Sequence, residues 1–355
     1  MTDDRTWPAI LSTLLAQDDL SVSQADWAMS RFMTGEATGA QIGGFLVALQ
    51  AKGVTVEEVI GFRDAILAEA LPIELPTMSL DIVGTGGDRF GTVNISSMAS
   101  IVAAAAGVPV VKHGNKAASS QSGSSDVFTA LGIDLGLDGD QLARSFDDAG
   151  IAFVHAARCL QGFRHVGPAR SELGIPTVFN FLGPLCNPVR PEACAVGVAD
   201  LERVPIFVGV CQLRGASALV FRGDDGLDEL TTTGHSRIWE VSRGGVTEHD
   251  LDPRDLGIPR AEISDLVGGT PEANADVVRR VLAGEHGPVR DIVLLNAAAG
   301  LVAYDIASVP ESVERPLLAR LKEKLEIAAA AVDSGAASRK LESWVRATQE
   351  HARIV

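Results

Sequence analysis

The sequence has few cysteines and a deficit of positive charge. Its four cysteines, in 355 residues, show no paired CxxC spacing for zinc and are too sparse for a disulfide framework, so we expect reduced thiols without chemistry. They are Cys159, Cys186, Cys194 and Cys211. Lysine and arginine number 30 against 46 aspartates and glutamates, which gives a formal net charge of −16. This balance disfavours a general attraction to nucleic acid or to an anionic membrane, so any phosphate site must be local.

Long apolar runs are also missing. The longest, Ile101–Val111 and Ile292–Tyr304, are interrupted by glycine, proline or asparagine, and they fall short of the ~20 residues that a membrane-spanning helix needs. The start, Met1–Arg5, has no basic region followed by an apolar stretch, so no secretory signal is visible. We therefore expect a soluble protein in the cytoplasm.

Length and composition predict more than one domain. With 355 residues, of which 46% are hydrophobic and 21% charged, the chain is globular in composition and long for a single core. Near the N-terminus, Thr55 is followed three residues later by Glu58, the capping-box pattern of a helix start. Apolar residues then recur near helical spacing, as at Val59, Phe62 and Ile66. This pattern predicts a small helical domain over residues 1–75.

From residue 76 onward, short apolar runs separated by glycines replace the helical period, which is typical of buried strands. Strands are predicted at Leu80–Val83, Val108–Val111, Ile151–Val154, Ala195–Val198, Ser217–Phe221 and Ile292–Leu295. Helices are predicted at Ser96–Ala106, Asp140–Ala149, Glu311–Val332 and around Leu341 and Trp344. Strands that alternate with helices predict an α/β domain over residues 76–355, with a mainly parallel central sheet.

The strand predicted at Leu80 runs directly into a glycine-rich turn, Gly84-Thr85-Gly86-Gly87-Asp88. Glycines let backbone N–H groups approach an anion, although a tight turn without a ligand has the same composition. The order G-x-G-G-D differs from the G-x-G-x-x-G of dinucleotide sites, and the Asp88 carboxylate would lie where a pyrophosphate should bind. The turn therefore favours a phosphate site with a metal ion or another donor over a dinucleotide site.

Two further segments are rich in small polar side chains. Thr92–Ser97 precedes an alanine-rich helix, where free N–H groups and hydroxyls beyond those needed for capping can bind phosphate. Lys112–Ser124 combines two lysines, one histidine, two glycines and four serines after the strand at Val108–Val111. A solvated loop explains such a composition in isolation. However, both loops follow strands at the predicted carboxyl edge of one parallel sheet, where α/β proteins bind ligands.

A third segment, Gly223–Glu229, places several carboxylates in a glycine-containing turn after the strand at Ser217–Phe221. A solvated loop is the common explanation for such a cluster. Beside a polyphosphate site the same carboxylates are also suitable Mg²⁺ ligands, because magnesium binds one or two carboxylates together with water and phosphate oxygens.

Together these motifs resemble the anthranilate phosphoribosyltransferase family of tryptophan biosynthesis, in one order along nearly the whole chain. The segments that carry the resemblance are Gly35–Thr38, Gly84–Asp88, Asn94–Ser97, Lys112–Asn115, Arg170 with Glu172–Gly174, Phe179–Leu185 with Asn187 and Pro188, Gly226–Glu229, and Asn296–Ala298. The resemblance implies a small helical domain, joined by part of residues 165–190, packed on a larger α/β domain of the nucleoside phosphorylase/phosphoribosyltransferase type. It also implies a homodimer formed through the helical part.

The resemblance further implies a site residue by residue. Phosphoribosyl pyrophosphate (PRPP) would be bound by Gly84, Gly87, Asp88, Thr92, Asn94, Ile95, Ser96, Ser97, Lys112, His113, Gly114, Asn115, Lys116, Ala117, Ala118, Ser119, Ser120 and Ser124. Anthranilate would be bound by Gly84, Asn115 and Arg170, with the arginine at its carboxylate. Mg²⁺ would be bound by Ser96, Asp228 and Glu229.

The implied reaction joins an aromatic amine to C1 of the ribose while pyrophosphate leaves. Sugar transfers of this kind develop oxocarbenium character, and lysines, backbone N–H groups and Mg²⁺ can stabilise the departing charge. Because an aniline-type amine arrives unprotonated, no catalytic base is assigned. His113 is interpreted as a loop residue, or as one that supports the binding residues, rather than as a proton carrier.

Three positions depart from the family pattern. Lys116 stands where arginine is usual and loses a bidentate fork, and Ser97 stands where threonine is common. Residues 157–163 differ from the family's usual His-Pro-Ala-Met type stretch near the acceptor. This segment motivates the alternative of transfer to a different aromatic amine. Two further alternatives are phosphorolysis of nucleosides, which the Asp228–Glu229 pair and the two loops argue against, and a non-catalytic phosphate sensor, which the retained metal and acceptor positions argue against.

Overall fold

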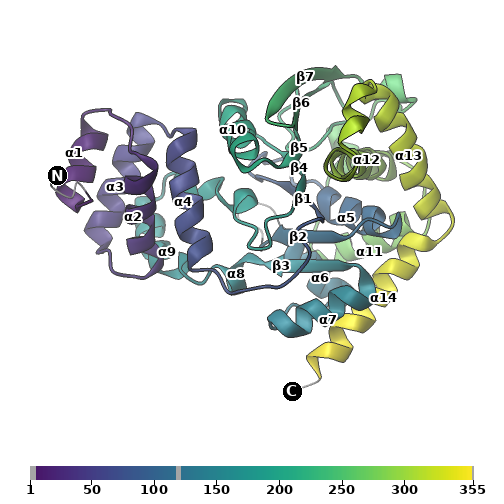
Figure 1. Cartoon of the computed structure of the whole chain (residues 1–355). Coiled ribbons are helices and arrows are strands. Elements are labelled where there is room, and N and C mark those ends of the chain that lie inside the picture. Colours follow the sequence, from purple (N-terminus) through teal and green to yellow (C-terminus); the bar gives the residue numbers. More distant parts are fainter. Residues whose placement is uncertain (1–4, 117–120, 354–355) are drawn as a thin grey trace. The chain divides into compact units, whose positions relative to one another are not determined.

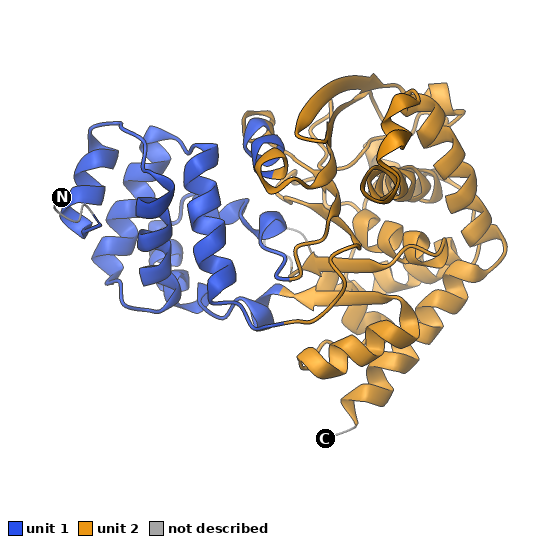
Figure 2. Ribbon diagram, in the orientation of Figure 1, with its two compact units in different colours: residues 1–72, 156–188, 205–210 blue, residues 73–155, 189–204, 211–355 orange. Residues whose placement is uncertain are grey.

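A computed structural model describes residues 5–116 and 121–353 of the chain. The chain divides into two compact units (Figure 2). The helical unit comprises Met1–Pro72, Ala156–Pro188 and Pro205–Val210, and the α/β unit comprises Ile73–His155, Val189–Val204 and Cys211–Val355. The helical unit thus includes two segments that lie far along the sequence from its N-terminal part.

The helical unit is built from short helices (Figure 1), and the first four each begin with a side-chain cap. Its helices are α1 (Trp7–Leu15), α2 (Val22–Met33), α3 (Gly39–Lys52), α4 (Val56–Ala68), α8 (Ala156–Cys159) and α9 (Phe163–Leu173), followed by the 3-10 turns η1 (Val178–Asn180) and η2 (Gly183–Leu185). Thr55 and Glu58 form the predicted capping box at the start of α4, and equivalent boxes begin α2 and α3. The predicted helix start is therefore confirmed.

An aromatic cluster forms the core of the four N-terminal helices. The Trp7 ring stacks on Phe32 with centroids 5.5 Å apart, Phe32 meets Phe45 edge-on at 5.3 Å, and Phe45 meets Phe62 at 5.8 Å. These four residues come from α1, α2, α3 and α4 in turn, so one chain of ring contacts connects all four helices. Edge-on and stacked pairs of this kind contribute about 0.5–1.5 kcal/mol each beyond their burial.

The α/β unit is organised around a seven-stranded sheet with the order β3-β2-β1-β4-β5-β6-β7. The strands are β1 (Leu80–Gly84), β2 (Val110–Gly114), β3 (Ile151–His155), β4 (Ala193–Gly197), β5 (Ser217–Gly223), β6 (Ser236–Ser242) and β7 (Gly245–Leu251). Strands β1 to β5 are parallel, while β6 and β7 pair antiparallel at one edge. The five predicted parallel strands are confirmed, and the antiparallel pair is an addition to the prediction.

The prediction of a strand at Ile292–Leu295 was wrong, because these residues lie in the helix α12 (Pro288–Ser308). A short apolar run cannot be assigned to strand or helix when every side of the element is buried, and α12 packs against α5 (Ile95–Ala105), β4 and β5. By length and composition α12 could cross a membrane, but 72% of its most apolar stretch is buried inside the protein. It is the central helix of the α/β core.

The structure contains further helices and 3-10 turns (Figure 1). They are α6 (Ser124–Leu131), α7 (Gly139–Ala149), α10 (Val204–Arg214), α11 (Pro271–Leu282), α13 (Leu317–Asp333) and α14 (Ala336–Ala352), with 3-10 turns η3 (Leu201–Arg203), η4 (Pro253–Leu256), η5 (Ile263–Leu266) and η6 (Pro310–Glu314). The predicted helix at Glu311–Val332 starts later than expected, because Pro316 separates η6 from α13. The predicted helices at Ser96–Ala106, at Asp140–Ala149 and around Leu341 are confirmed.

Candidate active site

Three parallel strands of the α/β unit end in glycine at the same edge of the sheet. Gly84 ends β1, Gly114 ends β2 and Gly197 ends β4, and Gly84 and Gly197 are paired in register. A Cβ atom built on Gly84 would lie 2.3 Å from Oδ2 of Asp228, and one on Gly197 would lie 1.7 Å from the Asp228 carbonyl oxygen. Only bare backbone at these strand ends lets the loop that carries Asp228 lie directly against the sheet.

Two acidic side chains of that loop are largely buried. Asp228 and Glu229 each keep 8% of their surface exposed. Oδ2 of Asp228 accepts a hydrogen bond from the Gly86 N–H at 2.6 Å, and the Glu229 carboxylate accepts one from the Ser96 N–H in the first turn of α5. The predicted glycine turn, the predicted helix start and the predicted acidic segment therefore meet.

Burial makes this acidic pair costly to ionise. Burial, followed by the nearby Asp88 carboxylate, raises the pKa of Asp228 to about 7. The pKa of Glu229 also lies well above its usual value, first because of burial and then because of the Asp228 charge. Three carboxylates, Asp88, Asp228 and Glu229, thus repel one another in a partly desolvated place.

One buried lysine side chain interacts electrostatically with the acidic pair. Lys112 of β2 is 2% exposed, and its Nζ donates to the Ile82 carbonyl at 2.5 Å and to the Ser96 hydroxyl at 3.3 Å. Burial lowers the pKa of Lys112, whereas the carboxylates of Asp81, Glu229 and Asp228 favour its charged form. Lys112 therefore both supports a hydroxyl of the site and supplies positive charge close to it.

A network of amides connects the first loop with the second. The Asn94 Nδ2 donates to the Ser122 carbonyl at 3.0 Å, and its Oδ1 accepts from Nδ2 of Asn274 at 2.9 Å. Oδ1 of Asn274 in turn accepts from the Gly269 N–H at 2.8 Å. Asn94 thus holds both loops together, and Asn274, a residue of α11 that the sequence interpretation missed, holds Asn94.

The other predicted PRPP residues differ in exposure. Gly87, Asn115 and Lys116 are exposed, and Asp88, Thr92, Ser96, Gly114 and Ser124 are intermediate. Ile95, Ser97 and His113 are buried, so their side chains face the core, and the His113 N–H donates to Asp81 at 3.1 Å. Ala117, Ala118, Ser119 and Ser120 lie outside the described residues. His113 lies in strand β2, so its interpretation as a loop residue was wrong, because the strand extends further along the chain than the apolar run at Val108–Val111 indicated.

The helical unit contains the predicted anthranilate residue Arg170. It lies in α9, its guanidinium carbon is 5.3 Å from the centre of the Phe179 ring, and partial burial lowers its pKa. The helix ends at Gly174, whose left-handed conformation with φ of 62° closes the last turn. The aromatic ring and the helix end together hold the arginine in a defined orientation.

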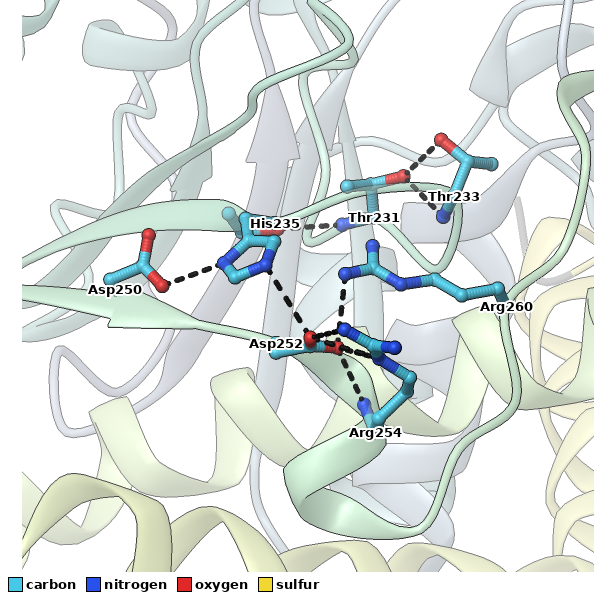
Figure 3. A network of polar contacts seen from close by, with 8 residues as sticks. Thr231, Thr233, His235, Asp250, Asp252, Arg254 and Arg260 are labelled. Atoms are coloured by element: carbon cyan, nitrogen blue, oxygen red, sulfur yellow. Dashed lines mark hydrogen bonds and ion pairs between the residues drawn. The ribbon is translucent and has the colours of Figure 1, made fainter.

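The loop beyond the acidic pair is held by its own polar contacts. Oδ2 of Asp225 accepts from the hydroxyls of Thr231, at 2.6 Å, and Thr233. Figure 3 shows the next layer, in which His235 contacts both Asp250 and Asp252, and Asp252 also pairs with Arg254 and Arg260. The hydrogen bond from Arg254 holds the pKa of Asp252 below its usual value. These contacts connect residues between Asp225 and Arg260 to one another.

Within the described ranges, no group of three or more His, Cys, Asp or Glu side chains is arranged to hold a metal alone. A metal bound by Asp228 and Glu229 would need further oxygen ligands, which suits magnesium with a phosphate substrate. A separate pocket of about 640 Å³ between α11 and α14, lined by residues such as Leu282, Val345 and Arg346, contains none of the predicted site residues.

Comparisons with known proteins agree with both units. Residues 8–70 match the glycosyl transferase family, helical bundle domain, and residues 77–338 match the glycosyl transferase family, a/b domain. An anthranilate phosphoribosyltransferase of Leifsonia xyli is 63% identical over 98% of this chain and 100% of that protein. The crystal structure of the Thermus thermophilus enzyme of the same name has a TM-score of 0.86 at 38% identity and covers 96% of this chain and 99% of that one.

A structure of the Saccharomyces cerevisiae anthranilate phosphoribosyltransferase in complex with PRPP and Mg has a TM-score of 0.87 at 27% identity, with 98% of this chain and 99% of that chain covered. The fold and the two matched domains define a glycosyltransferase with a helical bundle domain and an α/β domain. The chain belongs to the anthranilate phosphoribosyltransferase family. The resemblance stated from the sequence, and the fold class that it implied, are confirmed.

Proposed function

We propose that this enzyme transfers the phosphoribosyl group of 5-phosphoribosyl 1-pyrophosphate to the amine of anthranilate, in tryptophan biosynthesis. The products are N-(5-phosphoribosyl)anthranilate and pyrophosphate. The observation that carries the proposal is the buried pair Asp228 and Glu229, which meets the glycine turn at Gly86 and the first turn of α5 at Ser96. That arrangement suits a metal-bound pyrophosphate better than a single phosphate or a dinucleotide.

The residues present fit a magnesium ion. Burial and the neighbouring Asp88 oppose the ionisation of Asp228, and a divalent cation would relieve that repulsion. We infer that Asp228, Glu229 and the hydroxyl of Ser96 contribute to the metal site, with substrate oxygens completing the coordination. When bound, Mg²⁺ neutralises part of the charge that develops on the leaving pyrophosphate.

The protein's own groups contribute by position and charge. We infer that the two loops, Gly84–Ser97 and Lys112–Ser124, bind PRPP, with backbone N–H groups and small hydroxyls toward the phosphates. Lys112 holds the Ser96 hydroxyl and adds a positive charge close to the acidic pair. No side chain is assigned as a base, because the aromatic amine needs no deprotonation before it attacks.

Arg170 is proposed to bind the carboxylate of anthranilate. Its guanidinium is already oriented by the Phe179 ring, so little side-chain freedom is lost on binding. Gly84 and Asn115 remain the other predicted acceptor residues. The homodimer, the cytoplasmic location and the domain boundaries at residues 75 and 76 also remain predictions.

The test is a fluorescence assay with the purified protein. Anthranilate fluorescence should fall only when PRPP and Mg²⁺ are both supplied, and chromatography should show phosphoribosyl anthranilate and pyrophosphate. Absence of turnover at high protein concentration would contradict the proposal. A panel of substituted anilines and aminobenzoates tests the alternative acceptor that residues 157–163 suggest, and nucleoside cleavage by inorganic phosphate tests phosphorolysis.

A further inference from the structure

Asn296 is a fully buried amide in α12, outside the predicted site residues. Its Oδ1 accepts a hydrogen bond from the Leu230 N–H at 2.9 Å, and its Nδ2 donates to the Leu230 carbonyl at 2.9 Å. The same Nδ2 also donates to the Ile292 carbonyl, one turn earlier in the helix, at 2.9 Å. One side chain therefore pairs with both backbone groups of Leu230, as a neighbouring strand would.

Leu230 directly follows the acidic pair, so the position of its backbone constrains the positions of Asp228 and Glu229. The side chains of Leu227 and Leu230 are both fully buried, with Asp228 and Glu229 between them. The carboxylates of the pair accept hydrogen bonds from the Gly86 and Ser96 N–H groups. The Asn296 amide contacts the same loop at the main chain of Leu230.

Helix α12 is a rigid base for this contact. It packs on α5 and on strands β4 and β5, and a Cβ atom built on its Gly300 would lie 2.6 Å from Cδ1 of Ile82 in β1. The helix therefore has little room to move relative to the sheet that carries the glycine strand ends. Through Asn296 the loop takes its position from the same core as Gly84 and Gly197.

We propose that Asn296 is a positioning residue that fixes the Asp228–Glu229 pair for the metal–pyrophosphate complex. The inference rests on the proposed function, since the pair is the proposed magnesium site. The role requires an amide of this length, because Oδ1 must accept while Nδ2 donates. Aspartate could not donate to the two carbonyls, and leucine would leave the Leu230 N–H and carbonyl buried without partners.

Two substitutions separate the contact with the loop from the stability of the helix. Asn296→Leu removes all three hydrogen bonds. Asn296→Ser is milder, because a serine hydroxyl can still bond to the carbonyl one turn back, at Ile292, but cannot reach Leu230. Val302→Ala is the matched control, since Val302 is buried in the same helix and its truncation weakens packing while leaving the Leu230 contact in place.

Three measurements decide the matter. Hydrogen–deuterium exchange should show the Leu230 amide protected in the wild type and in Val302→Ala, and rapidly exchanging in Asn296→Ser. The Mg²⁺ concentration for half-maximal transfer, and the dissociation constant of Mn²⁺ measured by electron paramagnetic resonance with PRPP present, should both rise about tenfold or more in the Asn296 variants. The kcat at saturating Mg²⁺ should change much less.

Two results would overturn the proposal. The first is a Leu230 amide that stays protected in Asn296→Ser, because the loop would then be held without the amide. The second is a deprotected Leu230 with unchanged Mn²⁺ binding, which would make Asn296 a purely structural residue. A wild-type protein without Mg²⁺-dependent transfer would instead refute the proposed function, and the exchange and Mn²⁺ measurements would still test the role of Asn296.

Discussion

The replacement Gly197→Ala tests how tightly the acidic loop lies on the sheet. The added Cβ would lie 1.7 Å from the Asp228 carbonyl oxygen, whereas real Cβ atoms essentially never come closer than 3.0 Å to another heavy atom. The two segments must therefore separate by about 1.3 Å. Strand β4 is paired on both sides, with β1 and β5, so the loop rather than the strand is expected to move.

The displacement should affect stability and activity by different amounts. Forcing extra atoms into a packed place costs about 1–3 kcal/mol. A shift of about 1 Å in groups that position a substrate lowers the rate about 100-fold. We therefore expect a modestly lower melting temperature, a kcat/KM for PRPP reduced about 100-fold, and an increased requirement for Mg²⁺.

The assay combines anthranilate fluorescence at several Mg²⁺ concentrations with thermal unfolding. Gly245→Ala, at the start of β7, is the matched control, because its added Cβ would lie an ordinary 3.5 Å from the Ser242 carbonyl. The control should keep wild-type activity and change stability by less than about 0.5 kcal/mol. Wild-type kcat/KM and Mg²⁺ dependence in Gly197→Ala would refute the reasoning.

Four further predictions concern single groups. Arg170→Ala should raise the KM for anthranilate about 10-fold or more and leave the KM for PRPP unchanged, because it removes a charged partner worth about 1.5–3 kcal/mol. Steady-state kinetics in which only the KM for PRPP changes would contradict this. Asp228→Asn should raise the Mg²⁺ concentration for half-maximal activity, and an unchanged metal titration would remove Asp228 from the metal site. Burial raises the pKa of Cys159 from 9.0 to about 11, which reduces the thiolate fraction about 100-fold. Cys159 of the folded protein should therefore react with iodoacetamide at pH 8 far more slowly than Cys159 of the unfolded chain. Equal rates, measured by mass spectrometry, would contradict its burial. Arg254 depresses the folded pKa of Asp252, so the stabilisation by this carboxylate is present above the unfolded pKa of about 4 and is lost as the pH falls toward the folded value. The melting temperature of the wild type should therefore fall more steeply from pH 5 to pH 3 than that of Asp252→Asn. Parallel curves would count against the ion pair.

The sequence was most informative where function depends on local order along the chain. Gly84–Asp88 begins with the last residue of β1, whereas Lys112–Gly114 forms the end of β2 and Asn115 is the first residue after it. The ends of parallel strands meet at one edge whatever the details of packing. The positions of both loops could therefore be predicted. The glycine-rich turn and the helix start after it also follow from local chemistry.

Contacts that depend on distant parts of the chain could not be predicted in the same way. Asn274 and Asn296 lie on helices, where an asparagine has no local signal for the loop that it will hold. The role of Gly197 becomes visible only when Asp228 is placed above it.

Two of the errors in the fold have related causes, and strand β7 was missed as well. The run at Ile292–Leu295 is apolar on all sides, so its period could not distinguish a strand from a helix. Strand β6 was missed, and its apolar pattern is interrupted by Glu240, a buried carboxylate that pairs with Arg320 at 2.8 Å. The tertiary partner that makes this charge acceptable lies 80 residues along the chain.

The glycine strand ends have a consequence for redesign. Because Gly84, Gly114 and Gly197 carry no side chains, the loops lie directly against the main chain at these strand ends, and these three positions offer no side chain that could be shortened to accommodate a change in a loop. If one loop were exchanged between two members of the family, its contacts with the other two loops would no longer match. The three loops, together with Asn274 and Asn296 behind them, should therefore be transplanted as one cassette.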